Sequence, residues 1–141
     1  RRYDRAVLDA RHTLKLMDLC RETSPSEAWT VTHEQYRPFV IYHRIYAEAL
    51  GGVGDEKPQQ AIELINLGIQ ELEQALADLG TDENDDDEMV ARLQELREDL
   101  RERFEVGPTL QEQLAEAIQS EQYELAARLR DQISKYQRPT R

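Results

Sequence analysis

Residues 109–133 read TLQEQLAEAIQSEQYELAARLRDQI, and the pattern in this stretch predicts the fold most clearly. Apolar residues recur at every third or fourth position, which is the period of an amphipathic α-helix. Thr109 precedes the first of them and is a favourable N-cap. The periodicity breaks near Glu121 and Gln122. We therefore expect a helix over 109–122, a turn, and a second helix over 123–138.

Each of these two predicted helices carries one apolar stripe. The first stripe is formed by Leu110, Leu114, Ala117 and Ile118. The stripe that faces it is formed by Tyr123, Ala126, Ala127, Arg130 and Ile133. The adjacent alanines permit two helices to approach closely, and Tyr123 is expected to close the end of the hairpin.

This stretch resembles the UVR motif, which is shared by the excision-repair proteins UvrB and UvrC and occurs in some bacterial protease-chaperone and kinase-activator proteins. The matching residues are Leu110, Leu114, Ala117, Tyr123, Glu124, Ala126, Ala127, Leu129, Arg130, Asp131 and Ile133. Leu114 stands where the family often has methionine, and Tyr123 where phenylalanine is commoner. Both departures are conservative in shape.

The resemblance implies a protein–protein docking unit, because the family's hairpin pairs with another such hairpin in a small four-helix bundle. Two short helices bury too little apolar surface to be stable alone, which agrees with this. The predicted partner-binding residues are Leu110, Leu114, Ala117, Tyr123, Ala126, Ala127, Leu129, Arg130, Asp131 and Ile133. At the rim, Arg130 and Asp131 either form a surface ion pair of little energetic value or orient the partner hairpin.

The first 80 residues predict a helical body. Apolar periodicity predicts helices over about 3–22, 33–50 and 58–79, with a loop that holds Trp29, Val31 and Thr32 between the first two. Thr32 is the expected N-cap of the second helix, although Pro38 moves its start toward Tyr36 or kinks it.

Glycines mark the ends of these predicted helices. Gly51, Gly52 and Gly54 are expected to end the second helix, and Gly80 the third, which Asp55 caps at its start. Gly68 interrupts the third helix and indicates that another helix approaches closely there.

Residues 81–88 read TDENDDDE, with six acidic residues and no basic one. We interpret them as a solvated linker whose last aspartates cap a helix over about 86–104. A calcium loop is disfavoured, because the glycine and the spaced terminal glutamate of an EF-hand are missing. The predicted helix carries a heptad stripe and two favourable ion pairs, which suggests coiled-coil-like contact. The stripe is Met89, Leu93, Leu96 and Leu100, and the pairs are Glu88 with Arg92 and Asp99 with Arg103.

Composition supports an all-α fold, because 33% of the 141 residues are charged and glycine and proline number only 6 and 5. The expected organisation is a helical body over 1–80, an acidic linker with a coiled-coil-like helix over 81–107, and a UVR-like hairpin over 108–141. The chain starts at Arg1 rather than at methionine, so we expect a fragment of a longer protein.

The single cysteine, Cys20, is expected to be a buried structural thiol. With one cysteine no intrachain disulfide forms, which fits a cytoplasmic protein. No apolar run approaches the ~18 residues of a membrane span, so no membrane association is expected. The formal net charge is −11, and residues 55–107 carry 17 acidic and 5 basic residues. Direct nucleic-acid binding is therefore disfavoured.

The sequence contains none of the common catalytic motifs, and its histidines, His12, His33 and His43, are scattered. We expect no catalytic residue, no metal and no cofactor. His43 is expected to be a hydrogen-bonded core residue. An aromatic cluster in the second helix is interpreted as core and rim packing, or alternatively as the lining of a groove. Its members are Tyr36, Phe39, Tyr42 and Tyr46.

The leading hypothesis is a non-enzymatic protein–protein interaction module that docks through the hairpin, with self-association through the same surface as one form. The first alternative is an accessory factor of nucleotide excision repair that contacts repair complexes. The second is a regulatory subunit of a stress-response kinase or protease.

Overall fold

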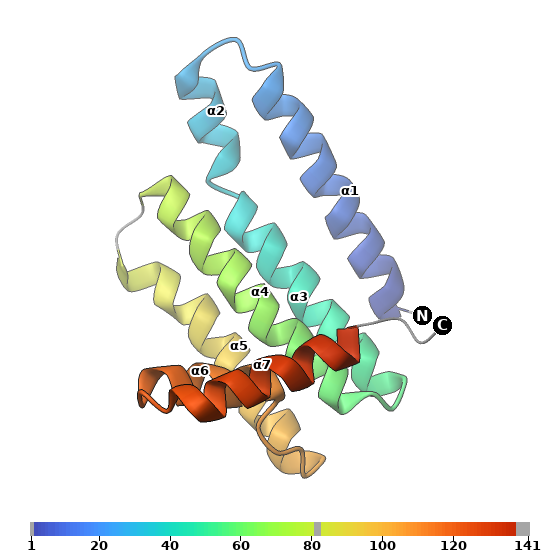
Figure 1. Ribbon diagram of the computed structural model, residues 1–141. Coiled ribbons are helices and arrows are strands. Elements are labelled where there is room, and N and C mark those ends of the chain that lie inside the picture. Colours follow the sequence, from blue (N-terminus) through green and yellow to red (C-terminus); the bar gives the residue numbers. More distant parts are fainter. Residues whose placement is uncertain (1, 81–82, 138–141) are drawn as a thin grey trace. The chain divides into compact units, whose positions relative to one another are not determined.

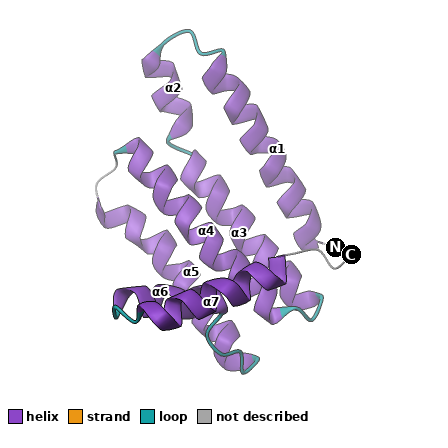
Figure 2. Ribbon diagram, viewed as in Figure 1, coloured by secondary structure: helices purple, strands orange, loops and turns teal. Residues whose placement is uncertain are grey.

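The computed structural model describes residues 2–80 and 83–137, and within these ranges its regular secondary structure is helical throughout (Figure 2). The predicted all-α class is confirmed. The chain divides into two compact units, one ending at Glu105 and the other beginning at Val106.

The first unit contains five helices among its described residues. They are α1 (Arg2–Glu22), α2 (Glu27–Glu34), α3 (Arg37–Gly54), α4 (Pro58–Leu79) and α5 (Glu83–Arg103). Figure 1 shows that α1, α3, α4 and α5 alternate in direction and that α2 leads into α3. Each long helix packs on the next one in the series, α1 on α3, α3 on α4, and α4 on α5.

The predicted loop between the first two helices was wrong, because α2 occupies it. Ser26 has an extended backbone, and its side chain accepts a hydrogen bond from the Trp29 backbone N–H at 3.2 Å, so it is the N-cap of α2. Thr32, the expected N-cap of the next helix, lies inside α2 instead. Its hydroxyl donates to the Ala28 carbonyl oxygen at 2.9 Å.

Pro38 was predicted either to move the start of this helix toward Tyr36 or to kink it. The start near Tyr36 is confirmed, because Tyr36 directly precedes α3. Pro38 lies in the first turn, where a backbone N–H has no helical partner to lose. The predicted end at residue 50 was wrong, because α3 continues to Gly54. Asp55 caps the end of α3, and Lys57 rather than Asp55 precedes α4.

The core of the first unit lies between α3 and α4. Its fully buried large side chains on these helices are Ile45, Ile62, Ile65 and Leu72. Gly68 faces Ile45, and a Cβ atom placed on Gly68 would lie 2.6–2.7 Å from three side-chain carbons of Ile45. The close approach predicted at Gly68 is confirmed. Gly80, with φ of 62°, ends α4 as predicted.

The acidic stretch is helical from Glu83 onward, so the predicted linker over 81–88 was wrong for that part; Thr81 and Asp82 lie outside the described residues. The apolar stripe of α5 faces inward, with Leu93 and Leu100 buried. Arg92 pairs with Glu88 at 2.6 Å as predicted. The second predicted pair, Asp99 with Arg103, is not formed between these described residues, and the Arg103 guanidinium instead lies over the ring of Phe104.

Arg37 joins three of the helices of the first unit. Its Nε and Nη2 atoms donate to the two carboxylate oxygens of Glu34 at 2.5 and 2.9 Å, and its Nη1 lies 2.8 Å from Asp18 Oδ1 on α1. The hydrogen bonds from Arg37 hold the pKa of the Glu34 carboxyl below its ordinary value. This ion pair fixes the junction of α2 and α3 against α1.

A second set of ion pairs crosses α1, α3 and α4. Arg44 on α3 forms a bidentate pair with Glu71 on α4 and lies 3.8 Å from Glu48. Glu48 in turn accepts from Arg11 on α1 at 2.7 Å. His43, the neighbour of Arg44, is exposed, so its predicted core position was wrong. Cys20 is half-buried rather than buried.

We predict that Gly68→Ala destabilises the protein. Alanine favours a helix by about 1 kcal/mol over glycine, but the added Cβ overlaps Ile45, and overpacking typically costs about 1–3 kcal/mol. Urea unfolding measures the net change. Gly54→Ala is the matched control, since its Cβ meets nothing within 4 Å. A Gly68→Ala protein more stable than the native chain would contradict the close approach.

We also predict that the Glu34–Arg37 pair makes stability depend on pH under acidic conditions. The folded-state pKa of Glu34 lies below its ordinary value of 4.5, so the pair stabilises fully above that value. Its contribution, about 1 kcal/mol or less, is lost as the pH falls through the folded-state pKa.

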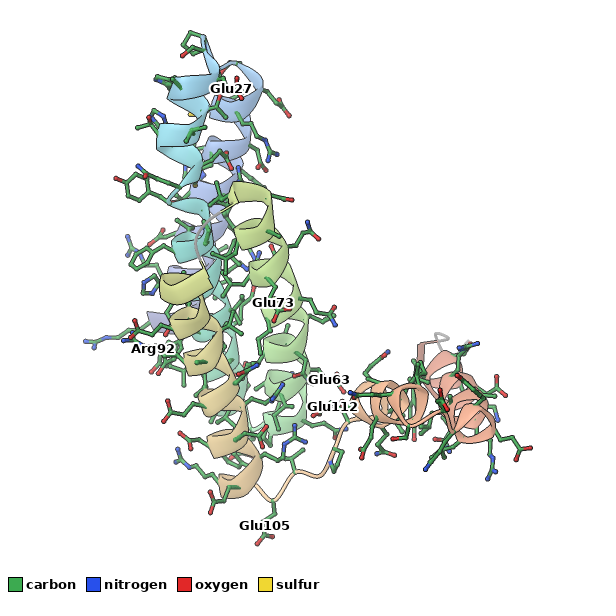
Figure 3. All side chains as sticks on the ribbon, turned by 90° about the vertical axis from the view of Figure 1, so that its left-hand side faces the viewer. Glu27, Glu63, Glu73, Arg92, Glu105 and Glu112 are labelled. Atoms are coloured by element: carbon green, nitrogen blue, oxygen red, sulfur yellow. The ribbon has the colours of Figure 1, made fainter. Side chains whose placement is uncertain are left out.

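Urea unfolding of the native chain and of Glu34→Gln between pH 7 and pH 3 tests this dependence. The difference in unfolding free energy between them should shrink toward the acidic end. Glu63→Gln is the control, because Glu63 projects from α4 (Figure 3) and is exposed. A difference that stays constant with pH would disprove the role of the Glu34 carboxylate.

Candidate protein-interaction site

The second unit is a hairpin of two helices, α6 (Leu110–Gln119) and α7 (Tyr123–Gln137). Thr109 is the N-cap of α6, as predicted. Its hydroxyl accepts from the Glu112 N–H at 3.2 Å, while the Glu112 carboxylate accepts from the Thr109 N–H at 3.1 Å. Figure 3 labels Glu112 at this end of α6. This reciprocal capping box fixes where the hairpin begins.

The turn of the hairpin lies where the sequence predicts it. Glu121 has a positive φ of 58°, and the Gln122 N–H donates to the Ala117 carbonyl oxygen at 2.8 Å. The Ala126 N–H then donates to the Gln122 carbonyl oxygen at 3.0 Å as α7 starts. The chain reverses within three residues, so the two helices run antiparallel.

The seam between α6 and α7 is small and apolar. Ala117, Ala126 and Leu129 are buried in it, and Leu110 and Leu114 pack against them while half-buried. Ala126 thus permits the close helix approach that the double alanine predicts. Ile133 is half-buried farther along α7.

Other residues predicted for the inward stripes face outward. Ala127 and Arg130 are exposed, Tyr123 is 66% exposed and Ile118 is 47% exposed. Tyr123 therefore does not close the end of the hairpin, and the prediction that it would was wrong. Leu129 rather than Ala127 completes the seam. Inward positions on α7 are 126, 129 and 133, and positions 123, 127 and 130 are rotated away from them by about 60–130°.

These outward residues gather on one face. In an antiparallel pair, the flank that follows the inward residues in sequence lies on the same side of both helices. Ile118 follows Ala117 and Arg130 follows Leu129, so both lie on this side. We name it the Tyr123 face. It contains Ala115, Ile118, Tyr123, Ala127 and Arg130, together with the exposed polar residues Gln111 and Ser134. Among these residues only Arg130 is charged.

The opposite face of the hairpin is more polar. It carries Gln113, Glu116, Leu125, Arg128 and Gln132. Asp131 points away from the seam and belongs to neither face. Among the residues that the structure describes, neither Arg130 nor Asp131 forms an ion pair. Sequence reasoning overlooked Ala115 and assigned Ile118 to the seam; counting helical angles outward from the buried alanines would have placed both.

Residues 108–138 match the protein family described as UVR, UvrB/uvrC motif. The resemblance predicted for the C-terminal hairpin is therefore confirmed, and this region of the chain carries a UVR motif, which is an interaction motif of repair proteins. The matched region is the second unit, whereas residues 1–107 lie outside it. Searches of curated proteins and of solved structures found no match to this chain.

In residues 2–80 and 83–137, no group of three or more histidine, cysteine, aspartate or glutamate side chains is placed to hold a metal ion. No helix in the same residues has the length and apolar character needed to cross a bilayer.

We predict opposite tolerances for the two adjacent alanines. Ala126→Leu places three carbons in the filled seam and should destabilise the hairpin by about 1–3 kcal/mol. Ala127→Leu adds the same carbons to an exposed position and should change stability by about 0.5 kcal/mol or less. Amide hydrogen exchange of α6 and α7 measures both changes. Equal destabilisation by the two variants would show that the seam is misassigned.

Proposed function

We propose that this protein is a non-enzymatic interaction module that docks a protein partner onto the Tyr123 face of its C-terminal hairpin. The observation that carries the proposal is the exposure of Tyr123, Ile118 and Ala127 together on one side of a UVR motif. Isolated exposed apolar residues are ordinary, but a contiguous apolar face is characteristic of an interaction surface.

The small size of the hairpin supports the same proposal. Its buried core contains only Ala117, Ala126 and Leu129 among the described residues. A seam of this size is marginal for two short helices, and a second pair of helices on the Tyr123 face would bury further apolar surface. Tyr123 is suited to an interface, because its ring is large and has few rotamers to lose.

Arg130 is the charged residue of the Tyr123 face. An exposed guanidinium at the edge of an apolar face contributes little energy by itself, yet it favours a partner that places a carboxylate opposite. Asp131 points elsewhere, so its predicted role in partner binding is weaker than that of Arg130. Leu110, Leu114, Ala117, Ala126 and Leu129 support the face from the seam.

A second candidate function follows from the family match. The matched motif is named after repair proteins, which favours a partner within a DNA-repair complex. The net charge of −11 disfavours direct contact with DNA, so we propose that such a role would run through protein contacts. A DNA-binding titration at low salt tests this point, and salt-dependent binding would contradict it.

We predict that Ala127→Arg removes partner binding while the protein stays folded. The long charged side chain enters the middle of the Tyr123 face, where a partner helix would otherwise lie. Affinity co-purification from the source cell, with the native chain and the variant as bait, measures the loss.

Gln132→Arg is the matched control, because it adds the same charge to the exposed opposite face of α7. Circular dichroism should give equal helix content for all three chains. A partner lost from Ala127→Arg alone supports the proposal. A partner retained by Ala127→Arg, or lost equally from both variants, would place the docking surface elsewhere.

A further inference from the structure

Helix α3, in the first unit, carries four rings that neighbouring helices leave uncovered. Tyr36 and Phe39 are 60% and 57% exposed, Tyr46 is 37% exposed, and His43 is exposed as well. Their spacing along the chain places them on one side of the helix. We name these four residues the aromatic stripe. The predicted core and rim packing therefore fits Tyr42, which is buried, and Tyr46 at the rim, but it was wrong for Tyr36 and Phe39.

The rings of the stripe are already packed against one another. Phe39 and His43 form an edge-to-face pair with ring centroids 4.3 Å apart. Tyr42 supports the stripe from below, with its ring 5.2 Å from His43 and 5.9 Å from Tyr46. Rings held in this way lose little rotamer freedom when a partner covers them, which favours binding.

A row of charged residues on α5 is joined to the underside of the stripe through Arg92. Arg92 pairs with Glu88 at 2.6 Å, and its guanidinium also interacts with the side chain of Tyr42. Glu95 and Asp99 follow Arg92 by three and seven residues, so they lie on the same side of α5. Because α3 and α5 run in the same direction (Figure 1), these two carboxylates follow Arg92 toward the C-terminal end of the stripe. We name Glu95 and Asp99 the acidic flank.

The carboxylates of the acidic flank are not neutralised by the arginines of α5. Arg92 is held by Glu88, and Arg103, the next arginine of the row, lies over the ring of Phe104. Among the residues that the structure describes, neither carboxylate of the flank has a cationic partner. Both are exposed. The aromatic stripe is therefore bordered on its α5 side by uncompensated negative charge.

We propose that a basic amphipathic helix of another protein docks on the aromatic stripe, with its apolar residues on the rings and its arginines or lysines against the acidic flank. The faces of Tyr and Phe rings also attract such cations. An apolar surface bordered by charge on one side gives a bound helix both affinity and orientation. The stripe spans ten residues, or about 15 Å, which is about three turns of the partner helix.

The same charges disfavour other occupants of the stripe. A second copy of this chain would bring its own acidic flank and its net charge of −11 to the site. Nucleic acid and an anionic lipid surface also carry charge of the same sign as the flank. Each of these is repelled where a basic helix is attracted, so the charge of the partner is the property that the acidic flank selects.

Titration of the full chain with two synthetic peptides, followed by fluorescence anisotropy, tests the charge of the partner. The first peptide is an amphipathic helix of about four turns, with leucines on one side and arginines beside them; in the second, glutamates replace the arginines. We expect the basic peptide to bind with a dissociation constant on the order of 10 μM that rises with salt, and the acidic peptide at least about 10-fold more weakly. Equal binding of both peptides, or no binding of the basic one, would overturn the proposal.

Charge reversal on the chain tests the position of the site. Glu95→Lys/Asp99→Lys should raise the dissociation constant of the basic peptide at least about 10-fold, because it places like charge beside the stripe. Glu63→Lys/Glu73→Lys is the matched control, since it changes the net charge equally at exposed residues of α4. Figure 3 shows Glu63 on the opposite side of the unit from Arg92. Equal weakening by both double variants would indicate general electrostatic attraction and would contradict a site at the flank.

Truncation of a ring tests the apolar part of the site. Phe39→Ala should raise the dissociation constant of the basic peptide about 10-fold, because it removes a central ring of the stripe. Leu67→Ala is the control, since Leu67 on α4 is 65% exposed and lies off the stripe. Circular dichroism should give equal helix content for both variants. Unchanged affinity of Phe39→Ala would overturn the docking of the peptide on the rings.

Two further outcomes would assign the surfaces differently. Ala127→Arg should leave peptide binding unchanged, because the Tyr123 face is not part of this site. Peptide binding that Ala127→Arg removes and Phe39→Ala leaves intact would place the basic partner on the hairpin and overturn the role of the stripe. A dimer of the native chain in sedimentation equilibrium that Phe39→Ala dissociates would assign the stripe to a second copy, again against the proposal.

Discussion

The contact between Gly68 of α4 and Ile45 of α3 sets the geometry of the first unit. Because Gly68 has no side chain, the three outer carbons of Ile45 occupy the volume that a Cβ would need. The two helices therefore lie close enough for Ile62, Ile65 and Leu72 to be completely buried. Arg44 reaches Glu71 across the same contact, and α5 packs on α4.

Ion pairs then decide which sides of α3 remain available. Arg37, Arg44 and Glu48 are held by partners on neighbouring helices. Partly exposed pairs of this kind add little net stability, but they keep charge away from the remaining side of the helix. That remaining side carries Tyr36, Phe39, His43 and Tyr46. The exposed rings therefore lie on the side of α3 that carries none of these three charged residues.

The two units offer different kinds of surface. The apolar seam of the hairpin is too small to stabilise its two helices well by itself. A partner that covers the Tyr123 face would add the most buried apolar surface. The first unit has an extensive core of its own, so its folding does not need a cover over the exposed rings of α3.

The sequence by itself determined the helical class, the close approach at Gly68, the end of α4 at Gly80 and the UVR hairpin with its Thr109 cap. The helical class, the end at Gly80 and the Thr109 cap depend on residues near one another in the chain, so periodicity and capping chemistry suffice. The glycine inside an apolar helix indicates a close approach, but the sequence does not identify Ile45 as the neighbour. Only the tertiary structure decided that α2 is helical, that Ala126 rather than Ala127 lies in the seam, and that the rings of α3 are exposed. These features depend on which neighbour covers a given side of a helix, and a stripe of apolar residues does not specify whether another helix lies against it.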